Sequence, residues 1–297
     1  MDRKSFIRKG ILGTGVLVSG VGTFSALEGN NDELSALKPM ELDQVGFNHI
    51  PNTTSKIMAS MVLHKADSRG NANHGWLQSF HTFSFANYYN PERMHFGVLR
   101  VLNDDTVEAG MGFGTHPHDN MEIISIPLEG DLEHKDSMGN LAVIKHGDIQ
   151  VMSAGTGIYH SEYNRNKDQQ VKFLQIWVFP NKRDVTPRYD QLTLDIKDRS
   201  NKLQQILSPN PEDAGVWIHQ VAWFHLGRFD QGVKTEYSLK REGNGVYAFV
   251  LKGSFEILGQ TVNQRDGLGL WEIKSFDLKA TSPDSEILLM DVPMSLS

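Results

Sequence analysis

The sequence predicts an all-β protein with two domains in tandem, each a sandwich or a barrel, and two observations lead to this expectation. From Met58 onward, short runs rich in β-branched and aromatic residues follow one another, separated by turn residues. The clearest of these strand candidates are 96–102, 122–128, 141–145, 149–153 and 171–179. A hydrophobic run, a glycine turn and a second run also occur twice, at 121–133 and 245–257, which indicates an internal duplication.

A polar stretch at 195–213, which contains Pro209 and Pro211, divides the strand candidates into two groups. Linkers between domains are typically polar and rich in proline or glycine. We therefore expect a first barrel at 57–190 and a second barrel at 191–297.

The N-terminal part of the chain differs in character from the rest. Basic residues are concentrated within 1–9, and a glycine-rich apolar run follows at 10–26. This order is typical of a secretory signal, and an N-terminal helix of the mature domain is the alternative. We expect a signal-like segment at 1–28 and a polar tether at 29–56.

The basic start also bears on the export route. Residues 3–8 read Arg-Lys-Ser-Phe-Ile-Arg, which resembles the twin-arginine export motif with lysine in place of the second arginine. We expect an exported protein, periplasmic in a Gram-negative cell, with the twin-arginine pathway as a candidate route. If the segment is not a signal, we expect a cytoplasmic protein.

The composition excludes several classes of function. The formal net charge is −7 and charges of both signs are interspersed, so we expect no nucleic-acid partner. The chain has no cysteine, which excludes disulfides, thiolate metal sites, iron–sulfur clusters and cysteine nucleophiles. Any bound metal must therefore have nitrogen and oxygen ligands. We also expect a monomer without stable membrane insertion of the mature chain.

His116 and His118 are the first candidates for metal ligands. Alternate residues of a strand share one face, so both imidazoles can point into a barrel while Pro117 points away. Because the chain has 12 histidines, one His-x-His pair by chance would not be surprising. The pair gains specificity only from the residues around it.

Two sets of spaced residues around this pair resemble the two motifs of the cupin fold. The first set is Gly110, His116, His118, Glu122 and Gly130. The second, more approximate set is Gly147, Gly155, His160 and Asn164. In cupins, which are double-stranded β-helices, the two motifs lie on neighbouring strands of a small barrel. The three imidazoles of the two sets would then converge.

Four longer motifs are similar to those of the pirin family, over about Met58 to Val292. They are His-Gly-Trp at 74–76, His-Thr-Phe-Ser-Phe-Ala-Asn-Tyr-Tyr at 81–89, Gly-Thr-His-Pro-His at 114–118 and Ser-Ala-Gly-Thr-Gly-Ile-Tyr-His-Ser-Glu at 153–162. The resemblance implies an all-β fold of two jelly-roll-type cupin barrels in tandem, with a metal in the first and no ligands in the second. It also implies quercetin 2,3-dioxygenase activity.

The resemblance and the general cupin pattern differ in the fourth metal ligand. The pirin motifs imply His116, His118, His160 and Glu162, whereas cupins often use the glutamate at the position of Glu122. Strand alternation places Glu162 on the face of His160, and places Glu122 on the face of His118 only in the absence of a bulge. We expect Glu162 as the ligand and Glu122 as an acceptor that orients a histidine ring.

The resemblance implies Fe(II) as the metal, and the ligand types also admit Cu, Mn, Ni or Co. For the activity, it implies a small aromatic or enol substrate and O2, with ring-opening dioxygenation of a flavonol and Glu162 as the base. Two other hypotheses stay open at this stage. One is a metal-loaded, redox-responsive interaction protein, and the other is a non-oxidative cupin that uses its metal as a Lewis acid.

The other histidines and the aromatic residues of the first barrel have less specific contexts. In the second barrel, His219 and His225 lack the His-x-His spacing, so we expect no metal there. We expect surface or structural roles for His49, His64, His134 and His146. His74 and His81 stay ambiguous. We expect core packing for Trp76, Phe80, Phe83 and Phe85, with an aromatic wall near the metal as the alternative.

Overall fold

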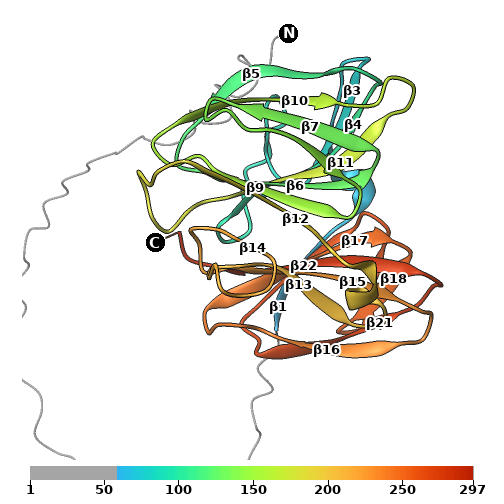
Figure 1. Cartoon of the computed structure of the whole chain (residues 1–297). Coiled ribbons are helices and arrows are strands. Elements are labelled where there is room, and N and C mark those ends of the chain that lie inside the picture. The colour runs from blue at the N-terminus through green and yellow to red at the C-terminus, as the bar shows by residue number, and fades with distance from the viewer. Residues whose placement is uncertain (1–58, 297) are drawn as a thin grey trace, which may run out of the picture. The chain divides into compact units, whose positions relative to one another are not determined.

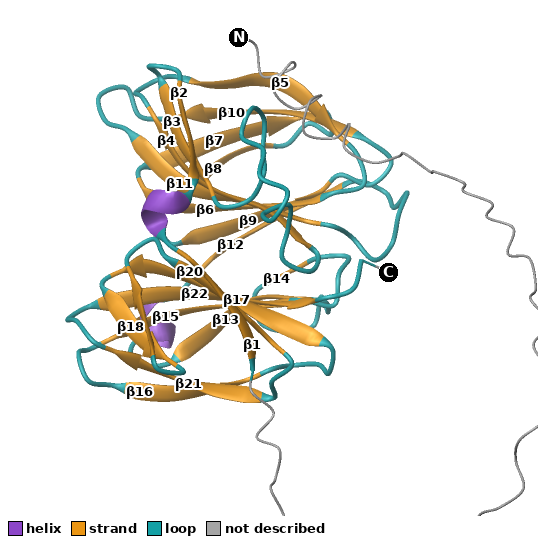
Figure 2. Cartoon of the chain, turned by 180° about the vertical axis from the view of Figure 1, so that it is seen from behind, coloured by secondary structure: helices purple, strands orange, loops and turns teal. Residues whose placement is uncertain are grey.

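The structure is a computed structural model that describes residues 59–296, so the predicted segments at 1–28 and 29–56 lie outside the described residues. The described chain is almost entirely β-structure, which confirms the predicted fold class (Figure 2). Two short 3-10 helices, η1 (Ala66–Ser68) and η2 (Ile196–Arg199), interrupt the strands. In this part of the chain, no helix has the length and apolar composition of a membrane span.

The first barrel consists of two sheets and occupies the upper half of Figure 1. The larger sheet has seven strands, in spatial order β12 (Arg188–Thr193), β9 (Asp148–Ser153), β6 (Glu122–Glu129), β11 (Val171–Val178), β4 (Leu99–Val107), β3 (Leu77–His81) and β2 (Gly70–Asn73). The smaller sheet has four, in the order β5 (Gly112–His118), β10 (Ile158–Asn164), β7 (Asp131–Asp136) and β8 (Leu141–Lys145). Each predicted strand candidate overlaps one of these strands.

The second barrel repeats this arrangement of seven and four strands. Its larger sheet has the order β1 (Ser60–His64), β20 (Gly267–Trp271), β17 (Asn244–Lys252), β22 (Ser285–Pro293), β15 (Trp223–Phe229), β13 (Leu203–Ser208) and β14 (Val216–Trp217). Its smaller sheet has the order β16 (Lys234–Ser238), β21 (Ser275–Ala280), β18 (Ser254–Ile257) and β19 (Gln260–Asn263).

The internal duplication predicted from the sequence corresponds to the same turn in each barrel. Gly130 joins β6 to β7, and Gly253 joins β17 to β18. Their φ angles are 73° and 72°, in the left-handed region that glycine adopts without steric cost. A Cβ on Gly130 would also lie 2.8 Å from the carbonyl oxygen of Gln170, so glycine is required there for space as well as conformation.

Two strands cross the domain limits that we expected along the chain. β1 pairs antiparallel with β20 of the second barrel, although it precedes the whole first barrel in sequence. Figure 1 shows it in blue among the orange strands. β12, which contains residue 190, pairs with β9 of the first barrel. A strand pairs with the strand that completes its hydrogen bonds and buries its apolar face, and that partner can be distant in sequence. The order of the chain therefore did not predict these two pairings.

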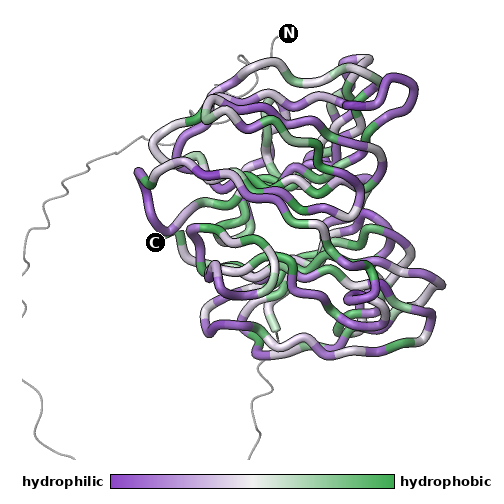
Figure 3. Tube along the Cα trace, in the orientation of Figure 1, coloured by the Kyte–Doolittle hydropathy of each residue, from purple (hydrophilic) through white to green (hydrophobic). Residues whose placement is uncertain are grey.

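The larger sheets of the two barrels pack against each other through their apolar outer faces. The described residues belong to one compact unit, and its largest apolar cluster contains Leu99 and Ile176 of the first barrel and Phe249 and Leu288 of the second. Figure 3 shows hydrophobic segments, in green, along the strands where the barrels meet. Packing of this kind between two sheets buries an entire strand face.

Strand β11 shows how this packing directs side chains into the first barrel. Leu174 and Ile176 belong to the apolar cluster shared with the second barrel. The residues between and beside them alternate to the opposite face, where Phe173 and Trp177 join two smaller apolar clusters. Gln175, a polar residue in this apolar strand, must therefore face the barrel interior.

The predicted core role of the aromatic residues near the start of the first barrel is confirmed for Phe83 and Phe85, which are both buried. Trp76 is partly buried and contacts the ring of Phe113 edge-on, with ring centroids 5.2 Å apart. The guanidinium of Arg69 lies 4.9 Å from the ring centroid of Phe80.

Candidate metal centre

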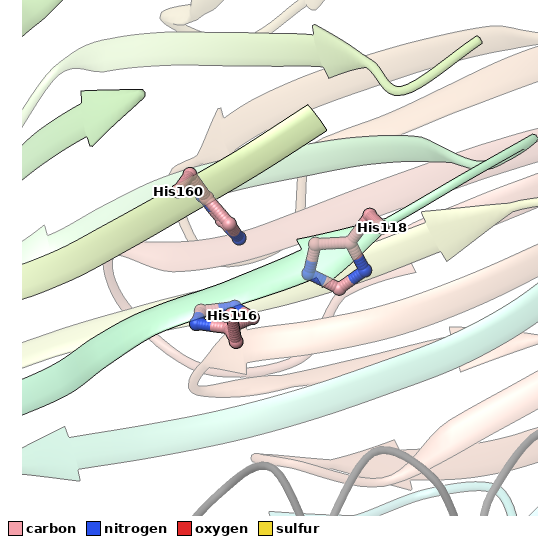
Figure 4. Close-up of side chains that lie close together, drawn as sticks. All are labelled: His116, His118 and His160. Atoms are coloured by element: carbon pink, nitrogen blue, oxygen red, sulfur yellow. The ribbon is translucent and has the colours of Figure 1, made fainter. Parts of the chain in front are cut away.

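Three histidines of the smaller sheet converge in the first barrel. His116 and His118 alternate on β5, and His160 of the neighbouring β10 lies directly opposite His116 in the antiparallel register. All three are buried, and each offers a ring nitrogen within 4.8 Å of those of the other two. Figure 4 shows the three rings close together. The structure therefore brings together the imidazoles that strand alternation and motif spacing had placed on one face.

The ring of His116 is oriented by its own strand. Its Nδ1 lies 2.8 Å from the carbonyl oxygen of Gly114. A carbonyl oxygen can only accept, so Nδ1 carries the proton and Nε2 carries the lone pair. In this tautomer, Nε2 is the nitrogen available to a metal.

The ring of His118 is held by an aromatic contact. It stands edge-on to the indole of Trp177, with centroids 5.0 Å apart and an interplanar angle of 86°. Trp177 in turn packs edge-on against Phe85 at 5.4 Å. This apolar side of the centre excludes water from around the His118 ring.

Glu162 is buried close along β10 but is not part of the histidine group. The register between β10 and β5 shifts after His160, so that Glu162 lies opposite Phe113. Its carboxylate accepts hydrogen bonds from Nε2 of Gln175, which lies 2.9 Å from both oxygens, and from Oγ of Ser125 at 3.4 Å. The structure thus brings the three histidines together, and the role of Glu162 as a fourth ligand stays a prediction.

Gln175 belongs to a row of buried polar side chains that crosses the larger sheet. The row contains Asn103 of β4, Gln175 of β11, Ser125 of β6 and Gln150 of β9, which lie directly opposite one another in the register. Directly opposite residues share one face of a sheet. Sequence reasoning missed this row, although Ser125, Gln150 and Gln175 each stand between two apolar residues of their strands, and that signal was available.

Comparisons with known proteins agree with this geometry. The family model described as Pirin matches residues 62–178, and that described as Quercetinase C-terminal cupin domain matches 205–292. The chain is 45% identical over 231 residues to the quercetin 2,3-dioxygenase of Escherichia coli K12, covering 78% of this chain and 98% of the relative. The chain belongs to the pirin family. The pirin-like protein of Caulobacter vibrioides is 37% identical, with 76% and 96% covered.

Solved structures show the same pirin fold. The bacterial pirin YhhW of Escherichia coli in complex with nickel(II) superimposes with a TM-score of 0.75 at 43% identity, covering 79% of this chain and 99% of that one. A quercetin 2,3-dioxygenase of Acinetobacter baumannii, at 20% identity and a TM-score of 0.63, supports the fold alone.

The histidine group of this pirin fits a transition metal on its own geometry. Metal to imidazole bonds are about 2.0–2.1 Å long, so ligand nitrogens around one ion lie about 3–4 Å apart. Ring nitrogens within 4.8 Å of one another need little adjustment to meet this condition. Three neutral imidazoles without thiolate suit several divalent ions of the first transition row.

Glu122 does not orient a histidine of the centre, so that prediction is wrong. Its hydrogen-bond partners are Oγ of Ser153, at 2.6 Å, and the backbone N–H of His219, which belongs to the second barrel. Burial raises the pKa of the Glu122 carboxyl to about 7, against the opposing effects of Ser153 and the nearby Arg188. Glu122 begins strand β6 and points toward the interface between the barrels. His118 ends a different strand, β5, so alternation along a strand could not predict the direction of Glu122.

The histidines for which we expected surface or structural roles differ in their exposure. His146 is exposed, as a surface residue should be, whereas His64 and His134 are buried. Nδ1 of His64 lies 2.8 Å from the hydroxyl of Tyr247, which is a structural contact. His134 lies inside the first barrel, beside His160. His49 lies outside the described residues.

His81 has the most unusual surroundings of the ambiguous histidines. It is buried against Phe85, and burial lowers its pKa to about 4. It lies opposite Asn103 in the register, so it extends the polar row of the larger sheet. His74, by contrast, is exposed.

In the second barrel, His225 takes part in a polar network. The hydroxyl of Tyr237 donates to Asp291 at 2.9 Å and lies 3.5 Å from Nδ1 of His225, whose pKa burial lowers to about 3. His219 contacts the ring of Trp217. Among the described residues, these side chains do not form a group of three potential metal ligands, and a metal-free second barrel stays a prediction.

Proposed function

We propose that this pirin is a metal-dependent dioxygenase that opens the ring of flavonols such as quercetin with O2. The observation that carries the proposal is the buried group of His116, His118 and His160, next to a carboxylate that is held in place. The names of the relatives with 45% identity support the choice of substrate.

In this proposal, the three histidines and Glu162 hold one divalent metal, with Fe(II) as the ion and Ni, Cu, Mn or Co as alternatives. The donor set of three nitrogens and one carboxylate oxygen suits these ions. When bound, the metal supplies a Lewis acid for the enol oxygen of the flavonol and a redox partner for O2. The side chains of the protein then determine how the flavonol is oriented and where its proton is transferred.

Glu162 is the base of this proposal. As a carboxylate, it can accept the proton of the flavonol 3-hydroxyl at an oxygen that Gln175 already orients. Oγ of Ser125 lies 3.2 Å from Oε1 of Gln175 and 3.4 Å from the carboxylate of Glu162, so its single hydroxyl proton can be donated to either side chain. A base held by two neighbours needs little reorganisation when the proton moves.

Oxygen uptake by the purified, metal-loaded protein tests the proposal. We expect uptake with quercetin and none with the flavone that lacks only the 3-hydroxyl, because that compound has no 3-hydroxyl proton for Glu162 to accept. His116→Ala, which removes one of the ring nitrogens of the group, is the matched control and should abolish uptake. Absence of uptake with quercetin by the metal-loaded wild-type protein would contradict the proposal.

A further inference from the structure

The buried His134 lies between a carboxylate and a histidine of the metal centre. On β7, its Nε2 lies 3.2 Å from Oδ2 of Asp136. On the other side of the ring, Nδ1 of His134 lies 3.4 Å from Nδ1 of His160. The register explains the placement, because Asp136 and His134 lie opposite His160 and Glu162 of β10. Three side chains thus form one continuous chain of polar contacts.

The position of the proton on His134 follows from the surroundings of Asp136. The carboxylate accepts the backbone N–H groups of Met138, at 2.9 Å, and Asn140, at 3.0 Å, and also the side-chain amide of Asn140, at 2.8 Å. A carboxylate with so many donors is ionised and can only accept. The Nε2 atom of His134 must therefore carry a proton, which it donates to Asp136.

The proton position on His160 follows in turn. A neutral imidazole with its proton on Nε2 has a lone pair on Nδ1. In the neutral form of His134, its Nδ1 is therefore an acceptor, and the facing Nδ1 of His160 donates. This leaves the lone pair of His160 on Nε2. A neutral histidine in water favours the opposite tautomer, with its proton on Nε2.

We propose that Asp136 and His134 are positioning residues that hold His160 in the Nδ1–H tautomer and so present its Nε2 to the metal. The inference deepens the proposed function, because it rests on His160 as a ligand. The carbonyl oxygen of Gly114, on the same strand, holds His116 in the same Nδ1–H tautomer. For His160, β7 supplies the acceptor.

The burial of His134 and Asp136 supports this positioning role. The side chains of His134 and Asp136 are both fully buried, and His160 is 1% exposed. Burying a polar pair costs desolvation that an apolar pair of similar size would avoid. The ring of Tyr189, from β12, covers His134 at a centroid distance of 4.8 Å. Strand β12, at the edge of the larger sheet, therefore contributes to covering these residues.

Nitrogen-15 NMR of the metal-free protein tests the inference directly. With labelled histidine at mildly alkaline pH, the long-range proton–nitrogen pattern of His160 reports which ring nitrogen carries the proton, and His160→Asn identifies its signals. We expect Nδ1–H in the wild-type protein. In His134→Phe, which keeps a ring but removes the acceptor, we expect a shift toward Nε2–H. We expect His134→Gln, whose amide oxygen can accept, to restore Nδ1–H.

Binding of Ni²⁺ provides a second readout without any flavonol. Loss of a group that orients a metal-binding histidine typically weakens the affinity about 10- to 100-fold. We expect this loss in His134→Phe and Asp136→Asn, and none in His146→Phe, a control at an exposed histidine. Thermal melts separate a local effect from unfolding of the barrel.

Two results would overturn the inference: an Nε2–H tautomer of His160 in the wild-type protein, or an unchanged tautomer and Ni²⁺ affinity in His134→Phe. If the protein turned over no quercetin, the inference would still stand on these measurements. If His160→Asn bound Ni²⁺ as tightly as the wild-type protein, the proposed metal site itself would fail, and the positioning role with it.

Discussion

Gln175 of β11 donates its side-chain amide to Glu162 of β10, at 2.9 Å from both carboxylate oxygens. The two strands belong to different sheets of the first barrel, so this contact joins the sheets inside the barrel. It also brings an anchored carboxylate close to the strand position of His160. The first two predictions follow from this pair.

Replacing Gln175 with leucine should leave Glu162 buried without its amide donor. We expect the free energy of unfolding to fall by about 1–3 kcal/mol, because a buried acceptor loses its partner. We also expect slower quercetin turnover, because the carboxylate is no longer oriented. Denaturant titration and oxygen uptake measure the two effects. Gln78→Leu, on the exposed side of β3, is the control and should change neither.

Replacing Glu162 with glutamine separates the roles of base and ligand. The amide keeps an oxygen that can coordinate a metal but cannot accept the flavonol proton. We expect turnover to fall about 10²- to 10⁴-fold, as for the loss of a general base, while metal content changes little. Parallel loss of metal and turnover would instead mean that Glu162 acts only as a ligand.

Glu122 predicts a pH dependence of stability. Because burial raises its pKa to about 7 from 4.5, the folded protein holds this proton after the unfolded chain has released it. The stabilising effect of the neutral carboxyl is therefore complete below about pH 4.5 and is lost as the pH rises through 7. Glu122→Gln has no such ionisation, so the variant should gain on the order of 3 kcal/mol in unfolding free energy relative to the wild-type protein as the pH rises through this range.

Denaturant unfolding of both proteins across this pH range measures the difference. A difference in unfolding free energy that stays constant from pH 4 to 8 would show that Glu122 has the same pKa in the folded and the unfolded protein, which would contradict the prediction.

Export by the segment at 1–28 is a further proposal, and cell fractionation tests it. We expect the mature chain outside the cytoplasm, with cleavage between Thr23 and Glu28, where small residues cluster. Replacing both Arg3 and Lys4 with alanine should retain the protein in the cytoplasm with its segment uncleaved. A wild-type protein that keeps Met1 and fractionates with the cytoplasm would refute the proposal.

The sequence predicted the histidine group because the relevant rule is local. His116 and His118 alternate on one strand, and the second motif supplied His160 with the expected spacing. Residues whose roles depend on pairing between distant strands were not predicted. The inward position of His134 depends on the pairing of β7 with β10, and the contact of Gln175 with Glu162 depends on the closure of two sheets.

The same distinction applies to the fold. Runs of alternating residues and glycine turns predicted the strands and the duplication, which are local features. The placement of β1 in the second barrel was not predicted, because nothing in residues 60–64 specifies a partner about 200 residues later. Glu122 was misplaced for a related reason, since its partners Ser153 and His219 come from distant parts of the chain.

Quercetin-dependent oxygen uptake at graded metal content tests the central claim most directly. Metal-free protein is loaded to known fractions with Fe(II) or Ni(II), and the initial rate is plotted against ions bound per chain. We predict a line through the origin that reaches its maximum at about one ion per chain, because the described residues contain a single group of three potential ligands. A rate that persists in the metal-free protein, or that keeps rising to two ions per chain, would contradict the account.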